Sequence, residues 1–353
     1  MLSIHFTELN TMTSWSTFLS TQGAIFNEKN LLSFGQPQAE LQAAGSQNIL
    51  TSLSHLGILE ISGEDAVTFL QGQVTNDVKQ LNGHTSHYTG YCTPKGRLLA
   101  LFLAFAHADH LHLQMPIELI EPISKRLKMY VMRSKVSIVD KSSEILCLGL
   151  AGPQAEKLIM DLFGQCPGNA HDLMSLDKVT LLHLPGVTPR FLVFTNAAHV
   201  EQIWQSLASS AVTVGKPAWD WLEIQAGIPE VLTATQEAFV PQMINLDALN
   251  GINFKKGCYT GQEIVARTHY LGKIKRRTLL AHIQTDTSPQ AGDGLQLKGL
   301  DEAIGQIVRV APAPQGGFDV LAEIRLEVLG GEFATVVWQQ HPLSFKALPY
   351  ALA

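Results

Sequence analysis

A change of pattern near Lys273 constrains the fold of this chain more than any other sequence feature. Beyond that residue, segments of strand length alternate or run apolar, and Gly and Pro clusters separate them. Before it, strand-like segments are followed by segments with helical periodicity. A run of short strands without helices is typical of a sandwich or barrel, so we expect an α+β body followed by a β-barrel. The expected barrel strands are Thr278–Gln284, Gly294–Lys298, Ala303–Val310, Phe318–Arg325 and Phe333–Trp338.

The α+β part carries a weak internal repeat. Leu56–Ile61 is predicted to be a strand, and Ser62 is expected to cap a helix that ends at Gly72. Ile145–Leu150 is a second predicted strand, followed by a helix with Pro153 in its first turn. Both strands lead into a glycine, and their alignment indicates two related α+β halves. The expected buried helix faces are Ala66, Val67, Phe69 and Leu70, and Ala155, Leu158, Ile159 and Leu162.

Composition narrows the class of protein. The chain has 353 residues, 46% of them hydrophobic and 16% charged, enough for two or three domains with a sizeable core. A net charge of −6 argues against a protein that coats nucleic acid. The four cysteines do not pair at the short spacings of zinc or redox motifs, so we expect no stable metal. We find no signal peptide or bilayer-spanning segment and expect a reducing, cytoplasmic compartment; the start at Met1 or Met12 stays open.

Two basic clusters survive the negative average. Each is interpreted either as a solvated face or as a site for an anion such as phosphate. The first comprises Lys125, Arg126, Lys128, Arg133 and Lys135, and the second comprises Arg267, Lys273, Lys275, Arg276 and Arg277. The nearby His107, His110 and His112 are expected at the surface rather than in a metal site.

The segment Lys255–Arg267 places one cysteine where its thiol could be reactive. Thr260 and Glu263 have the spacing of a capping box, so a helix is expected to begin at Gly261. Cys258 then lies in the turn before it, near free amides, the positive helix end and two lysines, which together lower a thiol pKa. The alternative is a structural cysteine that fills a small buried space.

The same segment resembles the signature of the YgfZ family, folate-binding relatives of the glycine-cleavage T protein, an aminomethyltransferase. The similar residues run through Phe239–Gln242, Asn245-Leu246 and Gly251–Arg267, and the resemblance spans about Leu53 to Tyr350. It implies a duplicated α+β folate-binding body of the T protein type and a C-terminal β-barrel. The expected divisions are an N-terminal extension and lead-in (1–47), the body (48–240), a linker with the cysteine motif (241–272) and the barrel (273–353).

The resemblance also implies ligands and partners. These are tetrahydrofolate or another reduced folate, iron–sulfur enzymes or their assembly machinery, and transiently tRNA. The implied catalytic residues are Cys258, Lys256, Gln262, Glu263 and Arg267, although Glu263 also suits a helix cap and Arg267 an ion pair with it. The implied folate contacts are Trp219, Gln225, Leu56, Lys95, Arg97 and Tyr259.

Several of these positions depart from the aminomethyltransferases. Gln225 stands where they carry a glutamate that holds the pterin ring, and an amide offers one acceptor in place of a carboxylate's two oxygens. Leu56 stands where some family members carry tryptophan, while Trp219 matches a tryptophan at the folate site or is simply core. The turn Tyr91–Arg97 has no carboxylate where they carry a catalytic aspartate-bearing segment.

Three functions therefore compete. The first is a folate-binding protein acting in iron–sulfur assembly or repair, and thereby in tRNA modification, through Cys258. The second is a folate-dependent aminomethyltransferase, which the missing carboxylate disfavours. The third is a scaffold that binds tRNA or a protein through the basic clusters. Whether the chain is an enzyme stays open.

Overall fold

The computed structural model describes residues 14–27, 30–270, 272, 274–300, 302–330 and 335–352. The chain divides into two compact units. Unit 1 contains the described residues of Met1–Gly63, Leu81–Ser86 and Phe105–Trp219, and unit 2 contains those of Glu64–Gln80, His87–Ala104 and Asp220–Ala353. The division expected at residues 48, 241 and 273 stays a prediction.

Unit 1 begins well before Asn48, contrary to the expectation of an unstructured lead-in. A helix over residues 14–21 precedes the hairpin of β1 (Ile25–Asn27) and β2 (Asn30–Ser33), and α2 (Pro37–Ala44) follows. The reason is burial, because Trp15 packs edge-on against Trp204 at 5.6 Å between ring centroids and donates to Ser52. This segment therefore belongs to the core of unit 1.

The main sheet of unit 1 has the strand order β10-β11-β12-β9-β3-β13. Its central strand β9 is fully buried and antiparallel to both neighbours, as its near-continuous apolar sequence predicts. Helices α5 and α6 cover one face with Ala155, Ile159, Val200 and Trp204. The bounds are β3 (Ile49–Ser52), β9 (Leu146–Ala151), α5 (Ala155–Phe163), β10 (Leu173–Ser175), β11 (Thr180–Leu184), β12 (Arg190–Thr195), α6 (Val200–Ala208) and β13 (Val212–Thr213).

A second three-strand arrangement in unit 1 repeats this pattern. β4 (Leu56–Ser62) pairs antiparallel with β7 (His110–Pro116) and with β8 (Ser137–Asp140). Gly63 and Gly152, which follow β4 and β9, both have positive φ angles, 109° and 132°. A Cβ on either would meet backbone atoms at 2.2 Å and 2.5 Å, so the aligned glycines share one conformational requirement.

The two helices of the repeat begin later than expected. α3 (Ala66–Gln71) starts after Asp65 because Ser62 is still the last residue of β4, and Gly72 ends the helix as predicted. α5 likewise starts after Pro153. Val67 and Leu162 were predicted to be buried but are 41% and 37% exposed, because each short helix covers its sheet with a narrower face.

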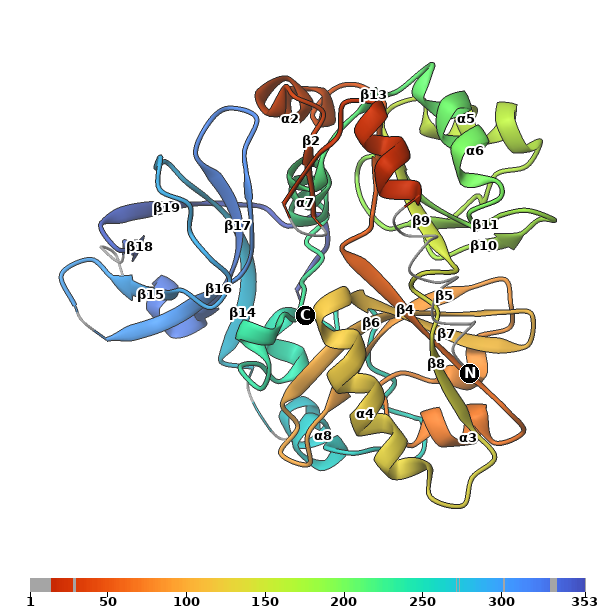
Figure 1. Ribbon diagram of the computed structural model, residues 1–353. Helices are drawn as coiled ribbons and strands as arrows, with labels where there is room; N and C mark the ends of the chain where they lie inside the picture. Colours follow the sequence, from red (N-terminus) through yellow and green to blue (C-terminus); the bar gives the residue numbers. More distant parts are fainter. Residues whose placement is uncertain are drawn as a thin grey trace. The chain divides into compact units, whose positions relative to one another are not determined.

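Unit 2 contains the predicted C-terminal barrel, which is confirmed. Its strands close in the order β14-β17-β16-β15-β18-β19 (Figure 1). Ile283, Leu295, Ile307 and Val320 are among the fully buried side chains that fill it. The sequence analysis missed the last strand. The bounds are β14 (Arg276–Ile283), β15 (Gly294–Leu297), β16 (Ala303–Pro312), β17 (Phe318–Arg325), η5 (Leu326–Gly330), β18 (Val336–Trp338) and β19 (His341–Lys346).

The remaining elements connect these parts. Within unit 2, β5 neighbours β6. Among the described residues no helix is both long and apolar enough to cross a bilayer. The bounds are η1 (Val78–Gln80), β5 (Ser86–Cys92), β6 (Leu98–His107), η2 (Ile117–Leu119), α4 (Ile120–Val131), α7 (Lys216–Gln225), η3 (Thr233–Thr235), η4 (Pro241–Ile244) and α8 (Gln262–Tyr270).

Candidate functional site

Cys258 differs from the other cysteines in its exposure. It is exposed, whereas Cys92 and Cys147 are buried and Cys166 is half-buried. Burial raises the pKa of Cys92 and of Cys147 to about 12 and that of Cys166 to about 11. Those three side chains therefore remain thiols at neutral pH, and Cys258 is the cysteine that solvent reaches.

Lys256 is held by backbone rather than by the thiol. Its ammonium donates to the carbonyl oxygens of Gln71, Val74 and Asn76 at 2.7, 2.6 and 2.8 Å. Burial lowers the pKa of Lys256 to about 8, and the charge of Asp77 opposes that lowering. The ammonium form dominates at pH 7, and its three protons match the three carbonyls.

Polar side chains join the same loop to neighbouring strands and to the motif segment. Thr75 accepts from the Gly90 amide at 2.8 Å and donates to the Gly251 carbonyl at 2.7 Å. Asn76 donates to the carbonyls of Tyr88 and Asn250 at 3.0 and 2.7 Å. Asn253 then accepts from the Lys255 amide at 2.9 Å and so shapes the turn before Cys258. The cysteine thus sits on a firmly mounted segment.

The helix after Cys258 begins at Gln262, one residue later than predicted. Gly261 has a φ of 84°, and a Cβ there would lie 2.4 Å from the Thr93 carbonyl oxygen. Only glycine fits this close approach of the motif to the β5–β6 turn. Among the described residues, no hydrogen bond joins Thr260 to Glu263, so the predicted capping box is absent.

α8 is anchored from its other side by a buried amide. Val265 is fully buried, and Gln242 donates to its carbonyl oxygen at 2.7 Å. The predicted site residues Gln262, Glu263 and Arg267 lie on this helix, with Glu263 and Arg267 exposed. No ion pair joins those two side chains in the described part of the chain, so the expected i,i+4 pair is not formed.

Tyr259 lies under the Lys256 ammonium, 5.1 Å from nitrogen to ring centroid. The ring is 8% exposed, and burial, with a smaller effect of Cys92, raises the pKa of its hydroxyl. A cation over an aromatic face stabilises the charge of the buried lysine. Tyr259 therefore supports Lys256, and its predicted role as a folate contact stays a prediction.

The β5–β6 turn brings Lys95 and Arg97 to the motif helix, since Gly96 lies against Ile264 and Gly261. Arg97 is occupied, because its guanidinium donates to the Ala238 carbonyl at 2.7 Å. Lys95 is exposed at the tip of the turn. Of the two cations predicted to meet an anion, Lys95 is the accessible one.

The other predicted folate contacts are Trp219, Gln225 and Leu56. Trp219 is 2% exposed in unit 1, with its ring against Gly149 and 5.8 Å from the Arg190 guanidinium carbon. Gln225, in unit 2, is half-buried, and Leu56 is the half-buried first residue of β4. Trp219 is therefore a core side chain in this structure.

Gln225 belongs to a polar network around a fully buried carboxylate, Asp319. Trp221 Nε1 and Gln225 Nε2 each donate to Asp319 Oδ2 at 2.9 Å. His282 Nδ1 and Lys346 Nζ each lie 2.8 Å from Asp319 Oδ1. Glutamine suits this position because its amide donates, whereas a glutamate would place a second carboxylate beside the first. Sequence reasoning missed this network.

A second buried network involves Arg309 on β16. A bulge between Ile307 and Arg309 redirects the side chain, which donates to Asp220 at 2.7 Å and lies 3.6 Å from Glu223. Burial opposes the charge of Arg309, but the carboxylates of Glu230, Asp220 and Glu223 outweigh it and raise its pKa. Glu223 is thus engaged with Arg309.

The two basic clusters differ in availability. In the second cluster, Arg276 pairs with Glu323, and the buried Arg277 pairs with Asp247 at 2.6 Å. Those two arginines are structural.

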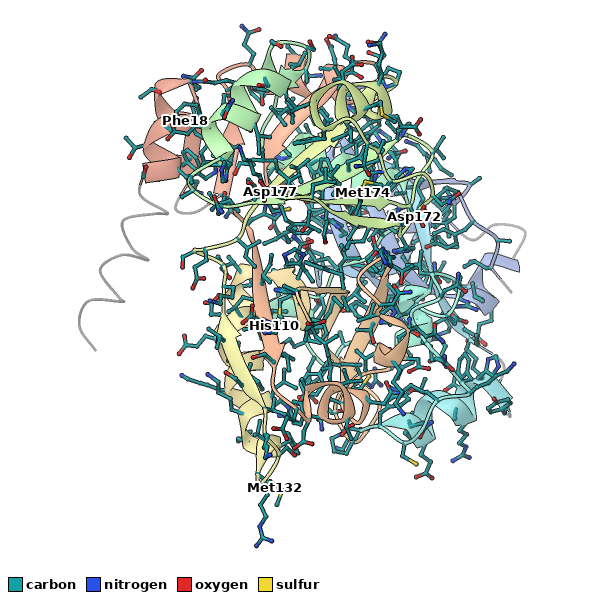
Figure 2. The ribbon with its side chains drawn as sticks, turned by 90° about the vertical axis from the view of Figure 1, so that its right-hand side faces the viewer. Phe18, His110, Met132, Asp172, Met174 and Asp177 are labelled. Carbon is teal, nitrogen blue, oxygen red and sulfur yellow. The ribbon has the colours of Figure 1, made fainter. Side chains whose placement is uncertain are left out.

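In the first cluster, Lys125 pairs with Glu121 at 2.5 Å along α4. The 88% exposed Met132 lies at the far end of the loop that follows this helix (Figure 2). Solvent therefore reaches this end of unit 1.

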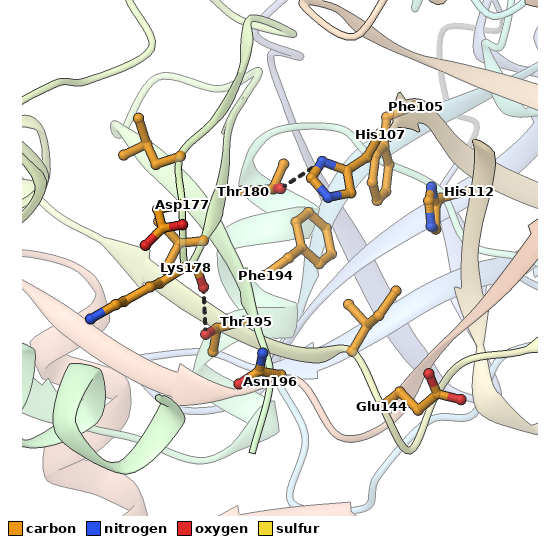
Figure 3. A pocket seen from close by; sticks show the side chains of 13 residues that line it. Phe105, His107, His112, Glu144, Asp177, Lys178, Thr180, Phe194, Thr195 and Asn196 are labelled. Atoms are coloured by element: carbon orange, nitrogen blue, oxygen red, sulfur yellow. Dashed lines mark hydrogen bonds between the residues drawn. The ribbon is translucent and has the colours of Figure 1, made fainter. Parts of the chain in front are cut away.

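Unit 1 also holds a pocket of about 200 Å³ that the sequence did not predict, shown in Figure 3. His107 contacts both Thr180 and Ser175 there, at 3.2 and 2.9 Å. His112 was expected at the surface but is 2% exposed, because its ring stacks on Phe105 at 5.1 Å. None of the predicted site residues lines this pocket. In the described part of the chain, no three His, Cys, Asp or Glu side chains gather to hold a metal ion.

Comparisons with known proteins agree on one family. Residues 20–256 match the GCVT N-terminal domain. The chain is 36% identical over 251 residues to the tRNA-modifying protein YgfZ of Colwellia psychrerythraea, covering 71% of this chain and 76% of that protein. It is 32% identical over 318 residues to the protein of the same name from Enterobacter sp. (strain 638), covering 90% and 97%.

A solved structure has the same fold. The crystal structure of glycine cleavage system aminomethyltransferase T from Bartonella henselae superposes with a TM-score of 0.71 at 18% identity. It covers 94% of this chain and 96% of that one. The expected fold class, a T protein-like α+β body with a C-terminal barrel, is thereby confirmed.

Proposed function

The chain belongs to the YgfZ family within the GCVT N-terminal domain proteins, and from that premise we propose that it acts in tRNA modification as a folate-binding protein whose reactive thiol is Cys258. The relatives named above supply the link to tRNA. The observation that carries the proposal is the exposure of Cys258 on a segment fixed by buried polar contacts.

Accessibility supports the choice of thiol. A cysteine that acts as nucleophile or transient ligand must meet its target, and a buried thiol with a raised pKa does so poorly. Cys258 is exposed, and a Cβ on the preceding Gly257 would meet no atom within 4 Å. A ligand or partner can therefore approach it.

The mounting of the segment supports a defined chemical role. Lys256, Thr75 and Asn76 fix the backbone on both sides of the cysteine through five hydrogen bonds of 2.6–3.0 Å to carbonyl oxygens. A loop with no task beyond connection is ordinarily less constrained. We propose that Lys256 positions the thiol, with Gln262, Glu263 and Arg267 forming the helix edge beside it.

A reduced folate fits the predicted contacts in part. The pterin edge donates hydrogen bonds, so it needs acceptors. The Gln225 amide nitrogen is committed to Asp319, which leaves its oxygen as one acceptor. We therefore propose that Gln225 holds a reduced folate through a single oxygen, with Trp219, Leu56, Lys95, Arg97 and Tyr259 as the further predicted contacts.

Aminomethyl transfer is the alternative that the shared fold raises. That reaction develops positive charge on a one-carbon unit, which a carboxylate stabilises. The turn Tyr91–Arg97 offers none, and Lys95 at its tip is itself a cation. A turnover assay with tetrahydrofolate and an aminomethyl donor discriminates the two, and we expect no turnover.

Assembly or repair of iron–sulfur clusters in partner enzymes is the finer part of the proposal. Iron and sulfide would be cargo, met briefly by the thiolate of Cys258. Free, unpaired cysteines suit the reducing cytoplasm in which such partners work.

The test is a cell that lacks the native gene and carries Cys258→Ser, with Cys166→Ser as the matched control. We expect Cys258→Ser to lose modified nucleosides from tRNA, measured by mass spectrometry, while the purified variant melts at the wild-type temperature. Cys166→Ser should behave as wild type, because Cys166 is half-buried with a raised pKa. Full modification with Cys258→Ser would refute the role of the thiol.

A separate measurement tests the folate. Tetrahydrofolate at saturation should raise the melting temperature of the wild-type protein, and Trp219→Ala should abolish that rise. An unchanged melting temperature would remove folate from the proposal and leave the thiol to be judged by the first test.

A further inference from the structure

An exposed aromatic cluster lies beside the motif segment of unit 2. Phe254 and His269 stack at 3.8 Å between ring centroids with an interplanar angle of 13°. Tyr270 stands edge-on to both, 6.2 Å from Phe254 and 4.8 Å from His269. We call Phe254, His269 and Tyr270 the aromatic platform. Tyr270 is 63% exposed, so the platform presents a ring to solvent.

The platform is held in place although it is not core. The opposite face of α8 is fixed by the fully buried Val265, whose carbonyl accepts from Gln242. Phe254 follows Asn253, whose amide donates to Thr75 at 3.0 Å. Three neighbouring aromatic side chains kept at a surface are typical of a binding site, because burial in a core would stabilise them more.

Two cations flank the platform. Lys255 adjoins Phe254 in sequence, and Arg267 lies three residues before Tyr270, on the same face of α8. Both side chains are exposed, and neither forms an ion pair with a described residue. Glu263, one turn before Arg267, is the acidic residue of that face. The surface therefore combines flat apolar rings with available positive charge.

These features select the chemistry of the ligand. Free ammonium and guanidinium groups favour an anion, whereas exposed aromatic faces favour a planar group. An acidic peptide supplies the first feature without the second. A single-stranded nucleic acid supplies both, because phosphates alternate with bases that can stack. Phe254 and Cys258 are four residues apart, so they lie within about 14 Å of each other.

We propose that the aromatic platform binds an unpaired nucleotide of RNA, with the base against Tyr270 and the flanking phosphates on Lys255 and Arg267. The inference deepens the proposed function, on which it rests, by naming the surface that receives RNA near the thiol. Folded RNA offers such nucleotides in its loops and ends, and stacking there tolerates different bases.

The experiment measures binding of the full-length protein to a fluorescein-labelled single-stranded RNA of 12 nucleotides by fluorescence anisotropy. The same strand annealed to its complement is the competing probe. We expect the single strand to bind more tightly, because paired bases cannot reach the ring. Tyr270→Ala should weaken binding by about tenfold or more, and Tyr270→Phe should bind as wild type.

Two further variants test the parts separately. Arg267→Gln should reduce the slope of log K against log salt by about 0.7, as expected for the loss of one phosphate contact on a single strand. Tyr130→Ala is the matched control, since Tyr130 is a 41% exposed tyrosine on the basic helix α4. It should leave binding unchanged.

Several outcomes would overturn the proposal. Equal affinity for single strand and duplex, with no effect of Tyr270→Ala, would mean that phosphates alone are bound. A lack of RNA binding, together with self-association in sedimentation that Tyr270→Ala abolishes, would make the platform a protein interface. The failure of the proposed function is distinguishable, because Cys258→Ser should bind the RNA normally whatever its effect on tRNA modification in cells.

Discussion

Replacing Lys256 by methionine tests whether the lysine is a structural anchor of the cysteine segment. The change keeps most of the aliphatic stem and removes three hydrogen bonds of 2.6–2.8 Å from the ammonium to carbonyl oxygens. Hydrogen bonds to charged groups contribute about 1.5–3 kcal/mol each. Lys256 is half-buried, so water reaches part of the exposed carbonyls and returns some of that energy. We expect a local loss of about 2–3 kcal/mol.

Hydrogen exchange measures this loss where it occurs. The amides of Thr75 and Asn76 are hydrogen-bonded to Gly90 and Thr89, and that of Asn253 to Thr75. A local loss of 2–3 kcal/mol corresponds to exchange about 30- to 150-fold faster at these amides. Amides of the barrel strands should exchange at the wild-type rate.

Lys255→Met is the matched control. Lys255 is the exposed neighbour, and its recorded hydrogen bond comes from the backbone amide, which methionine retains. Its exchange should stay within a factor of about two of wild type, the range of a surface substitution. Equal exchange in the Lys256→Met and Lys255→Met proteins would refute the anchoring role.

Three other substitutions probe the surroundings by urea unfolding. Gly261→Ala should cost about 2–3 kcal/mol, because φ is 84° and the new Cβ would lie 2.4 Å from the Thr93 oxygen, while Gly257→Ala, in open space, should be near neutral. Gln225→Glu should cost about 2 kcal/mol at pH 7, because it sets a second carboxylate beside the buried Asp319; a stabilised variant would contradict the network. Burial lowers the pKa of His112 from 6.5 to about 4, with neighbouring histidines adding to the shift and Glu60 opposing it. Because the folded pKa is below the unfolded one, this contribution is full above pH 6.5 and is lost as pH falls toward 4, by about 2 kcal/mol between pH 7 and pH 5. His112→Phe should remove that part of the acid sensitivity, and an unchanged pH dependence would exclude His112 as its source.

The sequence alone predicted the features that arise from local patterns. Strand-length apolar runs predicted the barrel, and β17 (Phe318–Arg325) has the bounds expected of it. Glycines marked Gly72 as a helix end and aligned Gly63 with Gly152, which share a left-handed backbone. Alternation and backbone permissiveness act between near neighbours, so they can be read without a partner.

The sequence also singled out Cys258 but could not show how its segment is mounted. The expected helix start at Gly261 and its capping box were wrong, because the tertiary contact with Thr93 holds that glycine in a left-handed conformation. Lys256 was assigned to the thiol from proximity in sequence. The structure shows its ammonium on carbonyls up to 185 residues away.

Only the tertiary structure decided which polar side chains are available. Gln225 meets Asp319 across 94 residues, and Arg277 meets Asp247 across 30. Lys255 and Arg267, which look no different in sequence, remain exposed beside the aromatic platform. The sequence determined which elements form, because backbone preference and apolar periodicity act locally; the fold determined which charges are spent on structure, because ion pairs and hydrogen bonds depend on distances that sequence separation does not set.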